Sequence, residues 1–523
     1  MSTPEISPST AHAPGEDAPI LTGAPLAKKL IGIAVGLILA VIVYFLMPDT
    51  LSEAMQAASD KAVEGGKAAF TPHGLAFTAA VAVLMGVWWV TEAIPLAATA
   101  LVPLVAFPAF HVADFKTTAT PYASGTIFLF MGGFFLALAL QRWNLHRRVA
   151  LITVLAVGTK PKMLILGFMV ATGFMSMWVS NTATAVMMLP IGLSVLTLIG
   201  EMKTDAEGRV KSNFAIALVL GIAYSASIAS LSTLIGTPPN TLLRGYLKDN
   251  HDINIGFGQW MLVGVPLAWG FLFITWFLLT HVLFKPEIDE IPGGKELIRR
   301  ELDAMGPMSR GEKLVGIVFV LAALSWIFLP TMFPDSGITD ELIAMAITLV
   351  LFLIPVHPAH GVALLDWDTA KHIPWDVLLL FGGGLALSAM FSATGLSTWI
   401  GDQAKGLGGL PIILFVIAVA ALVIFLTEMT SNTATAAAFL PIMGGVAMGL
   451  GQDVMLLVIP VALAATCAFM LPVATPPNAI AYGSGYIRIG DMVRGGIWLN
   501  LIGIVLISLT TMTLAVWVLG IQL

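Results

Sequence analysis

The chain has 523 residues, of which 58% are hydrophobic and only 11% are charged. Charge this sparse cannot cover the surface of a soluble domain of this length, so the composition excludes a soluble globular fold. The formal net charge of −6 is small and gives no signal of nucleic-acid binding. We therefore expect an all-α polytopic membrane protein that has the lipid bilayer as a partner and no nucleic acid.

Residues 1–26 are rich in Pro, Ala, Ser and Thr and contain no apolar run, which predicts a disordered tail and not a cleaved signal peptide. Downstream, apolar stretches of about 20 residues predict eleven membrane crossings. They lie at 28–47, 75–92, 95–112, 124–142, 213–248, 257–284, 311–332, 339–356, 375–395, 455–485 and 495–520.

Two further apolar segments, 162–199 and 408–449, are too long for one crossing. Each carries a Ser-Asn-Thr break near its middle, at 180–182 and at 431–433. They predict two re-entrant hairpins that enter and leave the membrane on one side.

Two of the crossings are interrupted by Thr-Pro-Pro-Asn, at 237–240 and at 475–478. Each is predicted to be a single crossing with an unwound centre. Gly-Gly, Ser-Asn-Thr and Thr-Pro-Pro-Asn thus recur in the same order in both halves of the chain. Five spans, an odd number, separate corresponding crossings, which predicts an inverted-topology repeat of the kind common in secondary transporters.

The distribution of positive charge predicts the orientation. With the N-terminus in the cytoplasm, 19 of the 25 Lys and Arg residues fall on the inner side of this layout and 6 on the outer side. We therefore expect a cytoplasmic N-terminus and a C-terminus outside a cell (inner) membrane.

The four polar breaks predict an anion site, because backbone leaves helical geometry within the hydrocarbon only where it is buried or lines a cavity. The Ser-Asn-Thr residues are placed to cap the half-helix that follows them, whose N-terminus favours an anion. Thr237 and Thr475 directly precede prolines and predict N-caps of inward-pointing helices. No Lys or Arg lies near the middle of any span.

The residues before each break predict the opposite preference. Ser176 and Thr427 lie one turn before the hairpin tips. Their hydroxyls, with carbonyls at the ends of half-helices, would suit a hard cation.

Three ionisable or reactive side chains are given structural roles. Glu92 follows an aromatic-rich stretch, which favours anchoring at a membrane interface. Glu428 lies off the helix face of Thr427, which favours a structural hydrogen bond over a coupling role. Cys467, the one cysteine, is interpreted as a small buried side chain.

The two Ser-Asn-Thr motifs, the two Thr-Pro-Pro-Asn motifs and Trp-Val-Thr-Glu-Ala-Ile-Pro at 89–95 resemble those of the divalent anion/sodium symporter family, which includes INDY-type di- and tricarboxylate transporters. The resemblance covers about residues 28–520. It implies a homodimer in which a scaffold domain holds the partner and a transport domain carrying both hairpins moves like an elevator.

The resemblance also implies site residues. The substrate carboxylates would contact Ser180, Asn181, Thr182, Thr237, Ser431, Asn432, Thr433 and Thr475. One sodium site would use Ser176, Ser180, Asn181 and the backbone of Gly236, and the other Thr427, Ser431, Asn432 and the backbone of Ala474. At the backbone position the two copies differ, with Gly236 in the first and Ala474 in the second.

The implied organisation divides the chain into alternating parts. Residues 1–26 form a cytoplasmic tail and 286–310 a cytoplasmic linker. The scaffold comprises 27–145 and 311–400, and the transport domain comprises 160–285 and 408–523.

These observations favour sodium-coupled symport of a C4-dicarboxylate such as succinate, with Na⁺ as coupling ion. The alternatives are an exchanger of dicarboxylates or citrate that sodium does not drive, transport of citrate or sulfate, and, more remotely, a channel. An enzyme is disfavoured, because Ser180 and Ser431 have no nearby histidine to activate them.

Overall fold

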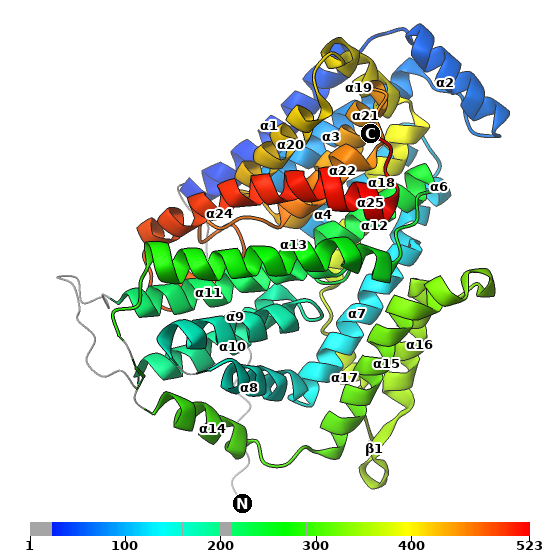
Figure 1. The fold of residues 1–523 in the computed structure, drawn as a ribbon. Coiled ribbons are helices and arrows are strands. Elements are labelled where there is room, and N and C mark those ends of the chain that lie inside the picture. Colours follow the sequence, from blue (N-terminus) through cyan, green and yellow to red (C-terminus); the bar gives the residue numbers. More distant parts are fainter. Residues whose placement is uncertain (1–23, 159, 198–211, 289, 292) are drawn as a thin grey trace, which may run out of the picture.

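The computed structural model describes residues 24–158, 160–197, 212–288, 290–291 and 293–523, and its fold is almost entirely helical (Figure 1). The predicted disorder of residues 1–26 falls mainly on the part of the chain outside this description. Because the apolar stretches are long and rich in helix formers, most form helices.

The helices of the first half lie between residues 24 and 277. They are α1 (Ala24–Leu46), α2 (Glu53–Glu64), α3 (Pro72–Thr91), α4 (Leu96–Thr99), α5 (Val102–Ala109), α6 (Phe115–Ala119), α7 (Gly125–Arg142), α8 (Leu145–Val157), α9 (Pro161–Ser176), α10 (Asn181–Thr197), α11 (Asn213–Ala229), α12 (Pro238–His251) and α13 (Phe257–Phe277).

The second half begins with α14 and includes one small β-hairpin. Its elements are α14 (Gly294–Ala304), α15 (Arg310–Met332), α16 (Asp340–Leu353), β1 (Pro355–His357), β2 (Val362–Ala363), α17 (Trp367–Ala370), α18 (Trp375–Ala393), α19 (Leu396–Ala404), α20 (Ile412–Thr427), α21 (Asn432–Gly449), α22 (Met455–Ala465), α23 (Pro476–Gly483), α24 (Ile489–Thr510) and α25 (Val516–Leu519). The two strands pair antiparallel, with Pro355 opposite Ala363.

The repeat predicted from the motifs appears in the order of the helices. The series α7 to α13 corresponds element by element to the series α18 to α24. Even the final members match, because α13 continues into a π-helical turn at Leu278–Leu283 and α24 into one at Thr511–Ala515.

Within the described residues, eight helices are long and apolar enough to cross a membrane. They agree with eight of the eleven predicted crossings. The other three contain shorter helices: 95–112 is divided into α4 and α5, 339–356 holds the 14-residue α16, and 455–485 is divided into α22 and α23. The count of eleven therefore stays a prediction.

The two long segments with a Ser-Asn-Thr break, 162–199 and 408–449, each form a pair of helices joined by a short tip. Four residues, 177–180, join α9 to α10, and 428–431 join α20 to α21. The Thr-Pro-Pro-Asn segments are unwound as predicted, since helix stops at Ser232 before α12 and at Ala465 before α23.

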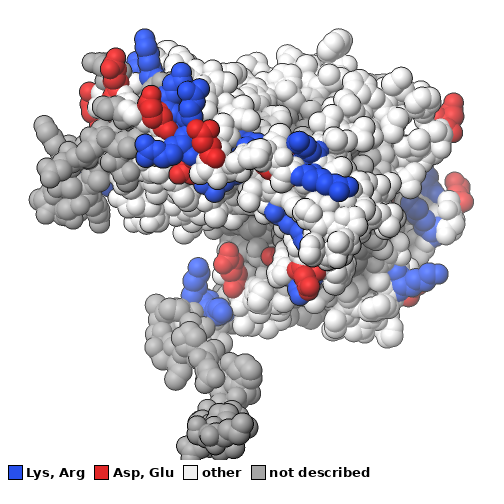
Figure 2. Space-filling model, turned by 90° about the horizontal axis from the view of Figure 1, so that it is seen from below, with Lys and Arg blue, Asp and Glu red and all other residues white. Residues whose placement is uncertain are grey.

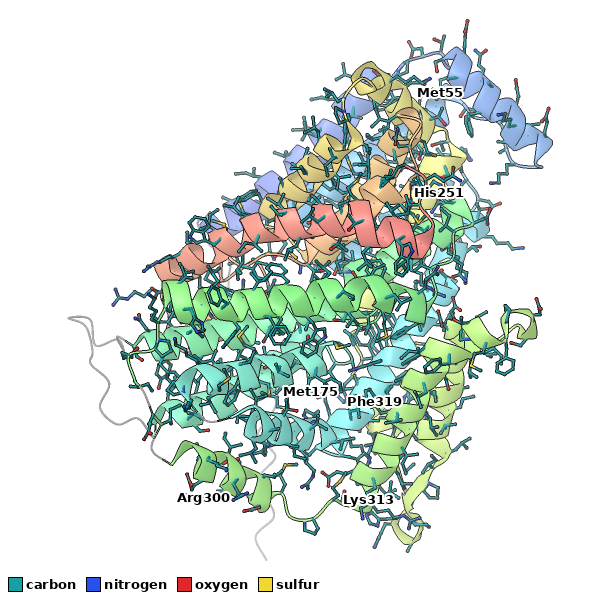
Figure 3. All side chains as sticks on the ribbon, in the orientation of Figure 1. Met55, Met175, His251, Arg300, Lys313 and Phe319 are labelled. Carbon is teal, nitrogen blue, oxygen red and sulfur yellow. The ribbon has the colours of Figure 1, made fainter. Side chains whose placement is uncertain are left out.

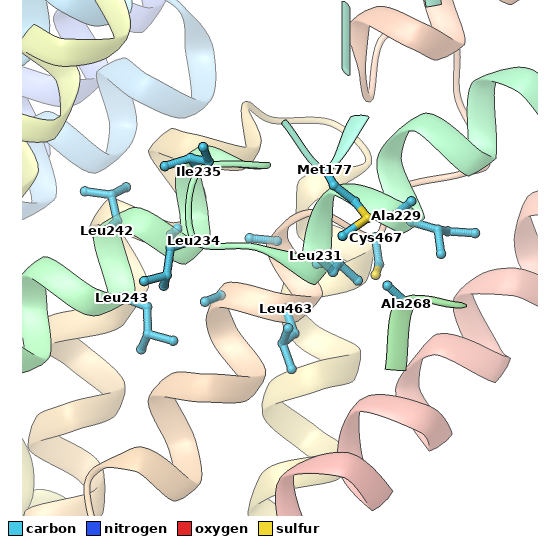
Figure 4. Packing of buried hydrophobic residues seen from close by; sticks show 14 of the residues in the cluster. Met177, Ala229, Leu231, Leu234, Ile235, Leu242, Leu243, Ala268, Leu463 and Cys467 are labelled. Atoms are coloured by element: carbon cyan, nitrogen blue, oxygen red, sulfur yellow. The ribbon is translucent and has the colours of Figure 1, made fainter. Parts of the chain in front are cut away.

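The apolar side chains form one continuous interior between the stacked helices, in which Met175 of α9 lies (Figure 3). Cys467 is fully buried there, as predicted, and belongs to the apolar cluster that Figure 4 shows from close by. On the face seen in Figure 2, charged side chains gather in clusters and leave broad uncharged areas between them. This arrangement suits a multi-pass membrane protein.

Candidate functional site

The two hairpin tips place a serine at the start of the second helix of each pair. Ser180 Oγ accepts a hydrogen bond from Ala183 N at 3.3 Å, and Ser431 Oγ accepts one from Ala434 N at 3.5 Å. Each serine thus satisfies one of the free N–H groups of its helix, and the remaining N–H groups stay available.

The two Thr-Pro-Pro-Asn motifs both begin helices, but their threonines differ. Thr475 Oγ1 accepts from Asn478 N at 3.3 Å and is the predicted N-cap. Thr237 also occupies the predicted N-cap position, directly before Pro238, but its side chain makes no capping hydrogen bond. Its hydroxyl instead lies 3.2 Å from Thr466 Oγ1, which belongs to the residue directly after α22.

The asparagines of these motifs hold the unwound segments in place, a role that the sequence analysis missed. Asn240 Nδ2 donates to the carbonyls of Leu231 at 3.2 Å and Thr233 at 2.9 Å. Asn478 Nδ2 donates at 3.1 Å to the carbonyls of Ala468 and Leu471. Buried backbone without helical partners needs such bonds, and an Asn directly after two prolines in each half was the signal available.

One cavity of about 890 Å³ brings the predicted substrate residues together. All eight line it: Ser180, Asn181, Thr182, Thr237, Ser431, Asn432, Thr433 and Thr475. Gly236 and Ala474 line it as well. Residues from both halves, about 250 positions apart in the sequence, therefore share one chamber.

The opposite wall of the cavity is largely apolar. Phe130, Phe134, Ala137, Leu138 and Gln141 project into it from α7 at helical spacing. The cavity therefore extends along one face of α7 from the hairpin tips towards the C-terminal end of that helix.

The sequence analysis did not identify the ionisable side chains that line the cavity. Lys28, at the start of α1, and His372 line the cavity, and so does Glu92. Glu92 ends α3 in a left-handed conformation with φ of 50° and is exposed. Its proximity to the cavity was not evident from the aromatic residues before it.

Beneath each hairpin tip lies a cluster of three oxygens. In the first oxygen cluster, Ser176 Oγ lies 2.6 Å from the carbonyl oxygen of Ala226 and 3.1 Å from Asn181 Oδ1. Ser176 is fully buried. One hydroxyl hydrogen serves only one of these two acceptors, so a cation between the three oxygens would satisfy the rest.

The second oxygen cluster has the same composition. Thr427 Oγ1 lies 2.8 Å from Asn432 Oδ1 and 3.0 Å from the carbonyl oxygen of Ala465. The two carbonyls, of Ala226 and Ala465, were absent from the predicted sets, because a backbone oxygen leaves no signal in residue type. Of the described residues, no group of three or more His, Cys, Asp or Glu side chains is placed to hold a metal ion.

The difference between Gly236 and Ala474 has a steric cause. A Cβ atom at Gly236 would lie 2.3 Å from the carbonyl oxygen of Ser230, which no side chain tolerates. The unwound backbone of the first half thus folds more tightly on itself than that of the second.

Glu428 makes the predicted structural hydrogen bonds. Its buried carboxylate accepts from three consecutive backbone N–H groups, those of Phe469 at 2.7 Å, Met470 at 2.9 Å and Leu471 at 3.0 Å. Asn500 Nδ2 also donates to it, at 2.7 Å. The carboxylate therefore fixes the unwound segment that carries Leu471 and Ala474 to the cavity wall.

Comparison with known proteins places these features in context. The chain matches the family described as "Sodium:sulfate symporter transmembrane region" over residues 70–521. It is 42% identical over 501 residues to the sodium-dependent dicarboxylate transporter SdcS of Staphylococcus saprophyticus, covering 94% of this chain and 93% of that protein. It is 44% identical over 453 residues to SdcS of Staphylococcus aureus strain USA300, covering 86% and 87%.

Two solved structures share the fold alone. The Alcanivorax borkumensis YdaH transporter, described as having an unusual topology, aligns with a TM-score of 0.53 at 15% identity, covering 84% of this chain and 99% of that one. Neisseria gonorrhoeae MtrF, described with a class of antimetabolite efflux pumps, aligns with a TM-score of 0.52 at 13% identity, covering 96% of each chain.

Proposed function

The chain belongs to the divalent anion/sodium symporter family, and from this premise we propose that it carries out sodium-coupled symport of a C4-dicarboxylate such as succinate. The relatives named as sodium-dependent dicarboxylate transporters support both the coupling ion and the substrate class.

The observation that carries the proposal is the single cavity lined by both hairpin tips and both Thr-Pro-Pro-Asn helix starts. Helix N-termini and hydroxyls on its polar wall suit two carboxylates at opposite ends of a short carbon chain. Under this proposal the eight predicted residues contact those carboxylates. The first and second oxygen clusters, completed by the backbone of Gly236 and Ala474, bind sodium on either side.

The division of the cavity wall supports an elevator mechanism. The hydroxyl and amide side chains at its four polar breaks come from the hairpins and the Thr-Pro-Pro-Asn segments, whereas α7 contributes mostly apolar side chains. The ionisable Lys28, Glu92 and His372 also line it, from the proposed scaffold. A substrate held by the groups at the polar breaks can travel with the body that carries them past the apolar face of α7. We propose that residues 160–285 and 408–523 form this moving body. Residues 27–145 and 311–400 then form the scaffold, which holds the partner subunit of a homodimer. The helical pairs α9–α10 and α20–α21 are re-entrant hairpins in this proposal.

Replacing Thr475 by alanine tests the substrate assignment. Thr475→Ala removes an N-cap that faces the cavity, which costs about 0.5–2 kcal/mol. We expect succinate binding to weaken by roughly 2- to 30-fold if all of this is felt in binding, with little change in sodium dependence beyond coupling. Titration calorimetry of the purified protein with succinate, in sodium and in choline buffer, measures both.

Thr71→Ala is the matched control, because Thr71 caps α3 through a 2.9 Å bond from Gly74 N and lies outside the cavity lining. Equal losses of succinate affinity in the two variants would refute the assignment of Thr475. Succinate binding of the unmodified protein that is the same in choline as in sodium would count against sodium coupling.

A further inference from the structure

A buried group of charges joins α12 to α16. Arg244 Nη1 donates to Glu341 Oε1 at 2.9 Å, and Arg244 Nη2 lies 3.3 Å from Asp340 Oδ2. Lys248 Nζ, one turn further along α12, lies 2.8 Å from the same Glu341 oxygen. The Arg244 and Asp340 side chains are only 1% and 3% exposed. We call these four residues the α12–α16 ion cluster.

The same cluster ties in the segment after α12. Arg244 Nε donates to the carbonyl of Ile255 at 3.0 Å, and Asp340 Oδ2 accepts from Phe257 N at 3.1 Å. Carbonyl and amide partners of this kind fix the register of two surfaces, whereas apolar contacts alone would let them slide. In the proposed function α12 and α13 belong to the moving body and α16 to the scaffold, so the cluster lies across the sliding interface.

The cluster lies against the first residue of α7, whereas the cavity is lined by residues further along that helix, from Phe130 to Gln141. At the start of α7, a Cβ atom on Gly125 would lie 3.1 Å from Glu341 Cγ, so this end touches the cluster. Gln141, near the other end, lines the cavity. The 16 intervening steps correspond to about 24 Å of helix. The cavity lining therefore extends along α7 away from its ion-paired end. Figure 1 shows the course of α7 beside α16.

Two further features distinguish this cluster. Asp340 Oδ1 and Glu341 Oε2 are buried and have no hydrogen-bond partner among the described residues, although their sister oxygens are paired. Water would satisfy both oxygens if the interface opened, because a buried polar network is costly when incompletely paired. The position of Arg244, four residues after Asn240, is not matched in the other half, where the position four residues after Asn478 is the exposed Tyr482.

We propose that the α12–α16 ion cluster is a one-sided latch, which holds the carrier with its cavity open at the Lys28 and His372 end and must break for the moving body to reach the opposite side. This inference rests on the proposed function. Because the latch is present in only one half, it biases the two access states unequally.

Side-specific labelling of a reporter cysteine tests the latch. Met429 lies at the second hairpin tip, lines the cavity and is 75% exposed. Met429→Cys in a Cys467→Ala background is labelled with a membrane-impermeant maleimide applied to one side of proteoliposomes of known orientation. With the latch intact, we expect labelling mainly from the Lys28 end. Glu341→Gln should raise the ratio of labelling from the opposite side to labelling from the Lys28 end by at least about tenfold, because removing one partner of a buried ion pair is strongly unfavourable.

Lys248→Gln is a milder variant that should shift the labelling ratio in the same direction. The Lys248 side chain is 36% exposed, and its loss leaves Arg244 paired with Asp340 and Glu341. It keeps the test decisive if Glu341→Gln does not fold. Asp366→Asn is the matched control, since it breaks the Arg142–Asp366 ion pair within the scaffold, and it should leave the labelling ratio unchanged.

An unchanged labelling ratio in the folded latch variants would overturn the latch. A shift as large in Asp366→Asn would overturn it too. The labelling experiment requires no substrate, so the latch and the transport function are tested independently. If the unmodified protein showed no sodium-driven uptake, the transport proposal would be rejected, but a shift in the labelling ratio would still support the latch.

Discussion

Glu428→Ala is expected to destabilise the protein by about 4 kcal/mol or more, because it removes the acceptor of three consecutive backbone N–H groups and of the Asn500 amide. Each buried donor left without a partner costs about 1–3 kcal/mol. The unwound segment before α23 should lose its fixed shape, and with it the cavity wall around Ala474. We therefore expect a lower unfolding temperature in detergent and loss of succinate binding.

Glu428→Gln separates this structural role from a coupling role. The amide keeps one acceptor oxygen but turns an N–H₂ group towards backbone donors, so we expect an intermediate loss of stability. Glu92→Ala is the control, because Glu92 is exposed and its truncation should change the unfolding temperature little. If Glu428→Gln left the unfolding temperature unchanged but altered the dependence of uptake on a proton gradient, Glu428 would instead be a coupling residue.

Thr427→Ala is expected to shift the sodium activation curve to higher concentration, by roughly 10- to 150-fold if one charge-assisted contact of about 1.5–3 kcal/mol is lost. Thr427 Oγ1 belongs to the second oxygen cluster with Asn432 and the carbonyl of Ala465. Succinate affinity should recover as sodium saturates, because the two ligands share one reciprocal coupling free energy. Succinate titrations at a series of sodium concentrations measure both effects.

Thr430→Ala is the matched control for this variant. Thr430 lies three residues further along and lines the cavity, but its hydroxyl bonds to the carbonyl of Leu426 at 3.0 Å and lies 2.7 Å from Thr435 Oγ1, outside the oxygen cluster. Its sodium curve should stay close to that of the unmodified protein. Weakened succinate binding in Thr427→Ala that persists at saturating sodium would contradict the division into anion and cation positions.

The sequence predicted the parts of the fold that depend on local pattern. Apolar length identified the long helices, and Ser-Asn-Thr and Thr-Pro-Pro-Asn located the four breaks, because small polar residues and prolines within apolar runs have few other uses. The repeated order of these motifs predicted one shared site, and the family resemblance implied which residues line it. Spacing alone also placed Glu428 in a structural role.

Features that depend on distant partners escaped the sequence analysis. The Thr237 hydroxyl bonds to Thr466 from the other half, so its N-cap geometry could not be judged locally. Lys28, Glu92 and His372 reach the cavity only through packing. The carbonyls of Ala226 and Ala465 and the partners of Arg244 depend on where helices far apart in sequence meet.

The central claim is sodium-driven dicarboxylate transport, and uptake of labelled succinate into proteoliposomes tests it most directly. With an inward sodium gradient, we expect succinate to accumulate inside above its external concentration. With choline in place of sodium, uptake should fall to the level of liposomes without protein. Uptake that ignores sodium and requires a dicarboxylate inside the vesicles would contradict the account and identify an exchanger, and sodium-independent uptake abolished by collapsing a pH gradient would identify a proton-coupled carrier.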